Sequence, residues 1–197
     1  MTESLDCISI GHIVREFIVF TDRESEEVLG SPAAYSSVTM ARLGVRAGIL
    51  TRIGPDMPNH LLRPFRDAGV DLGGLKIVKD EPTTATRLIY DETGDKSIEY
   101  PARATPILAE DMPVQYRSAK MFNICTMDHD VELEQIGIFA GLGPEMAIDL
   151  GGYGGAHGIR VEHAPGIPDE LPEIVKYFTL VKASDEDCRR INSDPGT

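Results

Sequence analysis

Residues 29–56, LGSPAAYSSVTMARLGVRAGILTRIGPD, decide the fold, because a glycine turn, a capped helix and a buried strand follow one another there. Ser31 can accept a hydrogen bond from a free helix amide, and Pro32 suits the first helical position. Apolar residues then recur at helical spacing until Gly44 ends the helix. The apolar run that follows predicts a strand that ends in Gly-Pro-Asp at residues 54–56.

A helix that begins directly after a glycine turn leaves backbone amides free at its N-terminus. Such amides bind anions or hydroxyl groups, so this stretch predicts a pocket for a small polar ligand. The same pattern also fits an ordinary strand–helix unit with a good cap, and the local sequence does not separate the two interpretations.

The chain on both sides of this stretch alternates between strand-like and helix-like segments. Residues 6–14 are a predicted first strand, residues 57–69 a helix and residues 75–79 a short strand. The alternation resumes in the second half, with strands at 119–127, 145–151 and 178–184 and helices at 131–143, 168–178 and from 184 onward. Such an alternation predicts an α/β fold with a parallel sheet and helices on its faces.

Residues 83–102, TTATRLIYDETGDKSIEYPA, interrupt this alternation. Two alternating runs flank the tetrapeptide Glu-Thr-Gly-Asp at 92–95, which is typical of a β-hairpin. A hairpin inserted into a strand–helix alternation usually lies outside the main sheet. Together with the strand-like residues 15–20, it predicts a small separate sheet that forms a lid over the strand ends.

The composition fits a single domain with a buried core, since 42% of the 197 residues are hydrophobic. The net charge of -13 and the lack of a basic face argue against a nucleic-acid partner. No apolar run is long enough for a membrane span, and no basic segment precedes the first apolar run as in a signal peptide. Cys7, Cys125 and Cys188 are far apart, which fits reduced thiols in a cytoplasmic protein.

Several polar motifs in the sequence do not match the pattern of a known site. The glycine-rich run 149–158 lacks Gly-Lys-Ser/Thr, and His157 takes the place of the last glycine of a GxGxxG motif. The group His157, Glu162 and His163 fits no zinc spacing. His12 follows the first strand, where ligands bind in α/β folds, but a lone histidine is more often structural.

The order of these segments resembles one family, the ribokinase-like carbohydrate kinases of the phosphofructokinase-B (PfkB) type. The family has a Gly-Gly turn, an Asn four residues after the second Gly, then Ala-x-Leu-Gly and Gly-x-Asp. The corresponding residues here are Gly30-Ser31, Tyr35, Ala41-Arg42-Leu43-Gly44 and Gly54-Pro55-Asp56, with further matching pieces at 68–75, 83–104, 147–152 and 181–187. The resemblance covers nearly the whole chain.

The resemblance implies a Rossmann-like αβα sandwich with a mostly parallel sheet, here incomplete, plus a small β lid. Members of the family transfer the γ-phosphoryl group of ATP, with Mg²⁺, to a hydroxyl of a sugar, a related polyol or a nucleoside. A lid would exclude water from such a transfer. Lid sheets in the family often pair two subunits, so the resemblance also implies a possible homodimer through the lid.

The resemblance also assigns substrate contacts to residues of this chain. Glu16 stands where the family has a lid-facing Asp that binds substrate hydroxyls. Ser31 replaces the second glycine of the turn, and Tyr35 replaces the hydroxyl-binding Asn. These replacements imply a pocket of a different shape from that of a ribose-specific enzyme, to which Gly30 and Ser31 would offer backbone amides.

Three further candidates come from the hairpin and from the C-terminal part of the sequence. Arg87 and Tyr100 lie on the predicted lid hairpin, and strand alternation does not say which of them faces the pocket. The family's Asn-x-x-Glu motif near the metal is matched by residues 184–187, where Asp187 keeps the acid and the Asn is lost. Asp187 is therefore a candidate for an indirect, water-mediated contact to Mg²⁺.

The family's Gly-Ala-Gly-Asp motif, which carries the catalytic Asp, has no counterpart in residues 1–197. We therefore expect a partial ribokinase-like domain that lacks the catalytic and nucleotide-binding part and is inactive alone. The alternative is a non-catalytic sugar-binding or regulatory protein derived from this fold. A dinucleotide-binding oxidoreductase is disfavoured, because GHIVRE at 11–16 replaces the GxGxxG motif that should follow the first strand.

Overall fold

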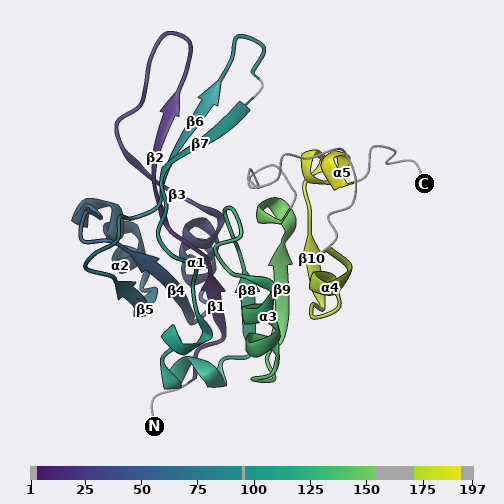
Figure 1. Ribbon diagram of the computed structural model, residues 1–197. Helices are drawn as coiled ribbons and strands as arrows, with labels where there is room; N and C mark the ends of the chain where they lie inside the picture. The colour runs from purple at the N-terminus through teal and green to yellow at the C-terminus, as the bar shows by residue number, and fades with distance from the viewer. Residues whose placement is uncertain (1–3, 95, 154–170, 192–197) are drawn as a thin grey trace.

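The computed structural model describes residues 4–94, 96–153 and 171–191, and shows a central sheet flanked by helices, with a smaller sheet projecting from its upper end (Figure 1). The central sheet has the strand order β10-β9-β8-β1-β4-β5, and all neighbouring strands are parallel. The predicted αβα architecture with a parallel sheet and a β lid is thus confirmed. The strands are β1 (Cys7–Ile10), β4 (Ala47–Ile53), β5 (Asp71–Ile77), β8 (Met121–Ile124), β9 (Glu145–Asp149) and β10 (Leu180–Lys182).

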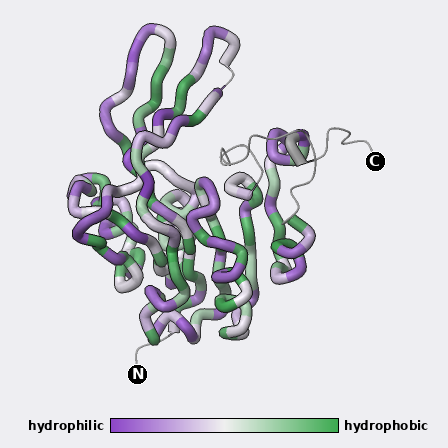
Figure 2. Tube along the Cα trace, viewed as in Figure 1, coloured by the Kyte–Doolittle hydropathy of each residue, from purple (hydrophilic) through white to green (hydrophobic). Residues whose placement is uncertain are grey.

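Helices cover both faces of the central sheet and create two apolar cores, because side chains alternate along each strand. On one face, α1 (Pro32–Arg42) and α2 (Arg63–Ala68) pack over Ile49 and Ile53 of β4. On the other face, Leu50 joins a core that includes the edge-to-face pair of Phe122 and Phe139, whose ring centroids are 6.0 Å apart. Figure 2 shows these hydrophobic segments concentrated in the central strands. The second core is covered by α3 (Leu133–Ala140) and α4 (Leu171–Val175), and α5 (Asp185–Ile191) follows β10.

The lid is a four-stranded sheet of order β3-β2-β6-β7, built from β2 (Val14–Val19), β3 (Val28–Gly30), β6 (Ala85–Tyr90) and β7 (Lys96–Ala102). Its central strands β2 and β6 are parallel, and each is flanked by an antiparallel partner. The strand-like segments predicted at residues 15–20 and 83–102 lie in this sheet. The three-residue strand β3 was not predicted, because it is too short to show an alternating pattern.

Three elements of the main domain differ from the sequence prediction. The first strand, predicted over residues 6–14, ends at Ile10, and Val14 already begins the lid strand β2. Strand β5 begins at Asp71, four residues before the predicted start, because its Gly73-Gly74 pair lacks the side chains that mark a strand. The backbone amide of Gly74 donates to the Tyr116 hydroxyl at 3.1 Å. The helix predicted at 57–69 is divided into a 3-10 turn and the short helix α2.

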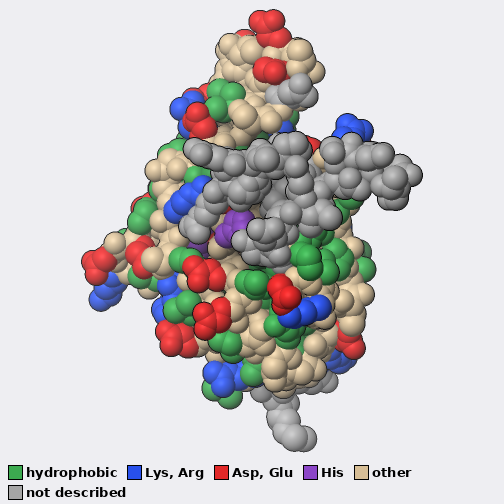
Figure 3. Space-filling view, turned by 45° about the vertical axis from the view of Figure 1, so that its right-hand side comes forward, with side chains coloured by type: hydrophobic (Ala, Val, Ile, Leu, Met, Phe, Trp, Pro, Cys, Tyr) green, Lys and Arg blue, Asp and Glu red, His purple; other side chains and the backbone are tan. Residues whose placement is uncertain are grey.

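Several charged side chains on the surface form ion pairs, such as Arg63 with Asp67 and Arg189 with Asp185. Figure 3 shows Lys and Arg side chains dispersed among acidic ones on one face of the molecule, with acidic groups at the top of the lid. None of the helices in the described part of the chain is long and apolar enough to cross a membrane.

One ion-pair network is buried and joins the loop after the lid to the central sheet. The side chain of Asp111 is fully buried, and it accepts hydrogen bonds from Arg52 Nε at 2.6 Å and from the Leu108 amide at 3.0 Å. Lys76 also donates to it, and Arg52 donates to Thr105 Oγ1 at 2.6 Å. Burial raises the pKa of Asp111, but the bonds from Arg52 and Lys76 outweigh this effect and hold the pKa below its usual value.

Removal of this buried carboxylate should destabilise the domain far more than removal of a surface one. We expect Asp111→Ala to lower the free energy of unfolding by about 3 kcal/mol, because it leaves the Arg52 charge buried without its main partner. Asp67→Ala breaks the exposed Arg63–Asp67 pair at 3.3 Å and should cost less than about 0.5 kcal/mol. Urea unfolding measures both values, and equal effects of the two substitutions would contradict this account.

Candidate functional site

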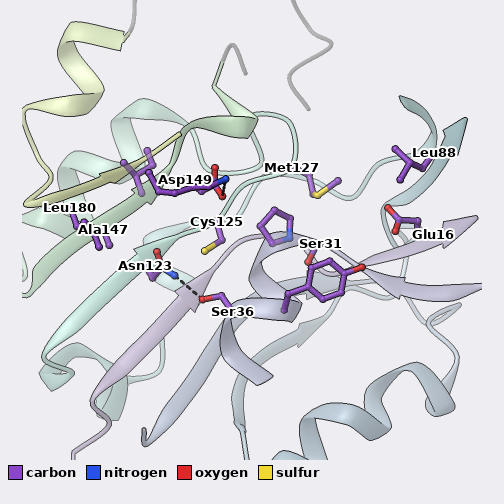
Figure 4. Close-up of a pocket in the computed structure, with 14 residues that line it drawn as sticks. Glu16, Ser31, Ser36, Leu88, Asn123, Cys125, Met127, Ala147, Asp149 and Leu180 are labelled. Atoms are coloured by element: carbon purple, nitrogen blue, oxygen red, sulfur yellow. Dashed lines mark hydrogen bonds and ion pairs between the residues drawn. The ribbon is translucent and has the colours of Figure 1, made fainter. Parts of the chain in front are cut away.

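A cavity of about 580 Å³ lies between the lid, the N-terminus of α1 and the carboxyl ends of the strands (Figure 4). The strand order reverses between β1 and β8, and ligands of open α/β sheets bind at such a reversal. The cavity lies beside this point. Its walls are formed by Glu16, Ser31, Pro32, Tyr35, Ser36, Leu88, Asn123, Cys125, Met127, Ala147, Ile148, Asp149, Leu180 and Lys182.

The N-terminus of α1 reaches the cavity through a strained residue. Ser31 has φ 114° and ψ 149°, a conformation that is almost restricted to glycine. Its hydroxyl accepts a hydrogen bond from the Ala34 amide at 3.1 Å, so the predicted N-cap is present. Ser31 and Pro32 both line the cavity. The backbone therefore keeps the glycine-type turn although the second glycine is absent.

Glu16 is the buried carboxylate of the site, with only 8% of its surface exposed. It lies on β2 of the lid and accepts a hydrogen bond from the Thr86 hydroxyl of β6 at 3.2 Å. It packs against Gly30, where a Cβ atom would stand 2.8 Å from the Glu16 carboxyl carbon. Burial raises the pKa of Glu16, and the bond from Thr86 offsets only part of the rise. Gly30 thus makes room for an acid that faces the cavity.

Comparisons with solved structures place this arrangement in a known fold. A pyrophosphate-dependent kinase of the ribokinase family superposes with a TM-score of 0.79 at 16% identity, over 95% of this chain and 65% of that chain. The fructokinase of Halothermothrix orenii gives 0.76 at 19% identity, over 97% and 73%. Arabidopsis thaliana ribokinase, in complex with ribose and ATP, gives 0.69 at 15% identity, over 97% and 64%.

The chain has the ribokinase fold. A sequence relative among curated proteins is the cytidine kinase of Thermococcus kodakarensis, 27% identical over 131 residues. The match covers 66% of this chain, and the chain spans about half (46%) of that relative's length. No family model matches the sequence.

Within the ribokinase fold, Tyr35 stands at the mouth of the cavity. It is 55% exposed, and its hydroxyl donates to the Leu29 carbonyl at 3.3 Å. Tyr35 thus joins Glu16 and Ser31, which were also predicted from the sequence, in one cavity wall.

Polar residues that were not predicted from the sequence also line the cavity. Asn123 Nδ2 donates to Ser36 Oγ at 2.8 Å on the sheet side of the cavity (Figure 4). On the same side, at the ends of β9 and β10, Lys182 Nζ donates to Asp149 Oδ2 at 2.9 Å. Asp149 and Lys182 both lie at strand ends, which is the signal that could have found them. A single polar residue inside a strand, such as Asn123, carries no comparable signal.

Arg87 and Tyr100, the two candidates on the lid hairpin, do not line this cavity. Arg87 lies one residue before Leu88, which faces the cavity, and it pairs with Glu24 Oε2 at 3.3 Å. The Arg103 guanidinium lies over the Tyr100 ring, 3.8 Å from the ring centroid. Both residues belong to a separate small polar cluster.

Asp187 forms a helix cap in the structure. Its Oδ2 accepts from the Ser184 amide at 2.7 Å, and the Ser184 hydroxyl accepts from the Asp187 amide at 3.1 Å. This reciprocal pair is a capping box that begins α5. No group of three His, Cys, Asp or Glu residues in the described segments is placed to hold a metal ion. His157, Glu162 and His163 lie outside the described residues.

His12 and the Asp128–Asp130 loop form a structural cluster below the lid. His12 Nε2 lies 3.0 Å from the Thr105 carbonyl and Nδ1 lies 3.0 Å from the Thr84 hydroxyl. A carbonyl only accepts, so Nε2 carries a proton. Burial lowers the pKa of His12, which keeps it neutral. Asp130 accepts from the Met127 amide at 2.7 Å and thereby stabilises the loop.

Relief of the strain at Ser31 should stabilise the protein. We expect Ser31→Gly to raise the free energy of unfolding by about 1 kcal/mol, because strain of roughly 1–3 kcal/mol is relieved and a glycine cap costs only a few tenths. Ser31→Ala keeps the strain and loses the cap, so it should lower the value by about 1 kcal/mol. Urea unfolding measures the free energy of unfolding of both variants. A Ser31→Gly variant that is less stable than the parent would contradict a strained backbone at Ser31.

Proposed function

We propose that the cavity is the acceptor site of an ATP-dependent kinase that phosphorylates a hydroxyl group of a neutral sugar, polyol or nucleoside. The observation that carries this proposal is the position of Glu16, a buried carboxyl group on lid strand β2 that lines the cavity beside the N-terminus of α1. A carboxylate accepts hydrogen bonds from hydroxyl groups, and helix amides donate to the same groups. The lid would exclude water from the transfer.

The charges of the cavity favour a neutral acceptor. The cavity wall includes two carboxyl groups, Glu16 and Asp149, and one ammonium group, Lys182, which is already bonded to Asp149. A sugar phosphate would therefore bring its charge close to the buried carboxyl group of Glu16. The relatives named above include a cytidine kinase and a ribokinase in complex with ribose, and both compounds are neutral and carry several hydroxyl groups. Cytidine and ribose are therefore the first acceptors to test.

We propose ATP and Mg²⁺ as the cofactors of the whole kinase, with the phosphoryl-transferring residues supplied by sequence that this chain does not contain. The described residues do not fit a Mg²⁺ site by themselves. The Asp187 carboxylate is engaged in the capping box, and Asp149 is bonded to Lys182 and to the Gly151 amide at 3.1 Å. The chain alone should therefore bind an acceptor without turning it over.

We also propose that two copies pair through the lid. Phe20 is 37% exposed and stacks on Tyr90 with ring centroids 5.5 Å apart. These rings place apolar surface on the lid, where a second lid could cover it. Sedimentation velocity of the parent and of Phe20→Ser tests this pairing, and a parent that is monomeric at every concentration would refute it.

Calorimetric titration with cytidine, ribose, fructose and myo-inositol tests the acceptor site, with fructose 6-phosphate as the anionic control. We expect at least one neutral compound to bind, and Glu16→Gln to weaken that binding about tenfold or more, since it removes hydrogen bonds to a charged group. Glu24→Gln is the matched control, because Glu24 pairs with Arg87 away from the cavity and its loss should leave affinity unchanged.

Binding of none of the neutral compounds, or equal affinity of Glu16→Gln and the parent, would contradict the proposed site. The alternative of a non-catalytic sugar-binding protein is favoured by Tyr35, which replaces an acceptor-binding Asn of the family. ATP consumption in the presence of the bound acceptor, measured on the protein as its gene encodes it, separates the two functions. Binding without ATP consumption there would support the alternative.

A further inference from the structure

The Gly54-Pro55-Asp56 turn after β4 does not line the cavity, although its sequence resembles a family motif. Instead, the two carboxylate oxygens of Asp56 bind the lid. Oδ1 accepts from the Thr83 amide and from the Thr83 hydroxyl, both at 2.8 Å. Oδ2 accepts from Arg15 Nη1 at 2.6 Å. One carboxylate of the main domain therefore contacts two separate segments of the lid.

These two segments are the roots of the central lid strands. Thr83 lies two residues before β6 begins, and Arg15 is the second residue of β2. The turn is closely fitted to this contact, because a Cβ atom on Gly54 would stand 2.1 Å from the Glu81 carbonyl and 2.5 Å from Asp56 Oδ1. The Gly54 amide also donates to the Thr83 hydroxyl at 2.9 Å. The glycine of the motif thus allows the approach, and the acid makes the contact.

Arg15 is adjacent to Glu16, and the two side chains leave β2 on opposite faces. Arg15 binds Asp56 and Glu27 outside the cavity, whereas Glu16 lines it. Thr86, the partner of Glu16, stands three residues after Thr83 on β6. The position of the cavity carboxylate therefore depends on how the roots of β2 and β6 are held.

We propose that Asp56 is a positioning residue that fixes the lid over the cavity by holding β2 and β6 at their roots. Burial raises the pKa of Asp56, but the hydrogen bonds from Thr83 and Arg15 outweigh this and hold the pKa below its ordinary value. The carboxylate is thus ionised at neutral pH, as its bond to the Arg15 guanidinium requires. Its effect on acceptor affinity rests on the proposed function, but its effect on the lid does not.

Amide hydrogen exchange of the free chain tests the contact without any ligand. Asp56→Asn keeps an oxygen that can accept from Thr83, but its amide cannot accept from Arg15. We expect exchange of the β2 and β6 amides to accelerate about tenfold, while the β1 and β8 amides change little. Arg15→Lys, which keeps the charge, should accelerate the same amides less than Arg15→Met.

The matched control is Asp6→Asn, which removes another Asp–Arg pair at the amino end of the central sheet, where Arg46 Nε donates to Asp6 Oδ2 at 2.8 Å. This variant should not accelerate lid exchange selectively. The proposal would be overturned if the lid amides of Asp56→Asn exchanged at the same rate as those of the parent. It would also be overturned if amide exchange accelerated equally in all strands. The second result would mean that Asp56 supports only global stability.

Acceptor binding provides the second readout. With whichever compound of the calorimetric panel binds the parent, Asp56→Asn should weaken the affinity although Glu16 is intact, and Asp6→Asn should not. Unchanged affinity in Asp56→Asn, with a compound that binds the parent, would also overturn the positioning role. Failure of every compound to bind the parent would instead refute the proposed function, and hydrogen exchange would then decide the role of Asp56 alone.

Discussion

The close contact between the Glu16 carboxylate and the Gly30 turn is the constraint on which the rest of the site depends. A buried carboxylate is costly unless it is hydrogen-bonded, and Thr86 is its one bonded partner that the described structure records. The contact holds the lid strand β2 close to the start of α1. It requires glycine at residue 30, because a side chain there would collide with Glu16. It also brings the acid close to the start of α1, where Ser31 and Pro32 line the cavity. Lid, helix and carboxylate thus meet in one cavity.

Two features of the chain reduce stability and form part of this cavity. Ser31 adopts a glycine-type conformation, and Glu16 places a carboxyl group away from water. Sites that bind or react often store such strain, and the surrounding structure compensates for it. Here the compensation is visible in the cap from Ser31 to Ala34 and in the Asp56 contacts at the base of the lid. The ribokinase fold supplies the frame, and these local contacts set the shape of the proposed acceptor site.

Much of the fold could be predicted, because periodicity and caps are local signals. The Ser31-Pro32 start of α1 and the alternation of strands and helices followed from the sequence directly. The strand β3 and the early start of β5 could not, since one is three residues long and the other contains Gly73-Gly74. For the site, alternation could not decide which lid residues face the cavity, and only the tertiary structure places Arg87 with Glu24. The helix-capping role of Asp187 was hidden because a capping box and a ligand-binding acid look alike in sequence.

A crystal structure of this chain with the neutral acceptor that binds it most tightly would show directly whether Glu16 and the start of α1 form the acceptor site. We expect hydroxyl groups of the ligand to lie within hydrogen-bond distance of the Glu16 carboxyl group and of the backbone at the start of α1, with the lid above them. A ligand bound elsewhere, with Glu16 still bonded only to Thr86, would contradict this expectation.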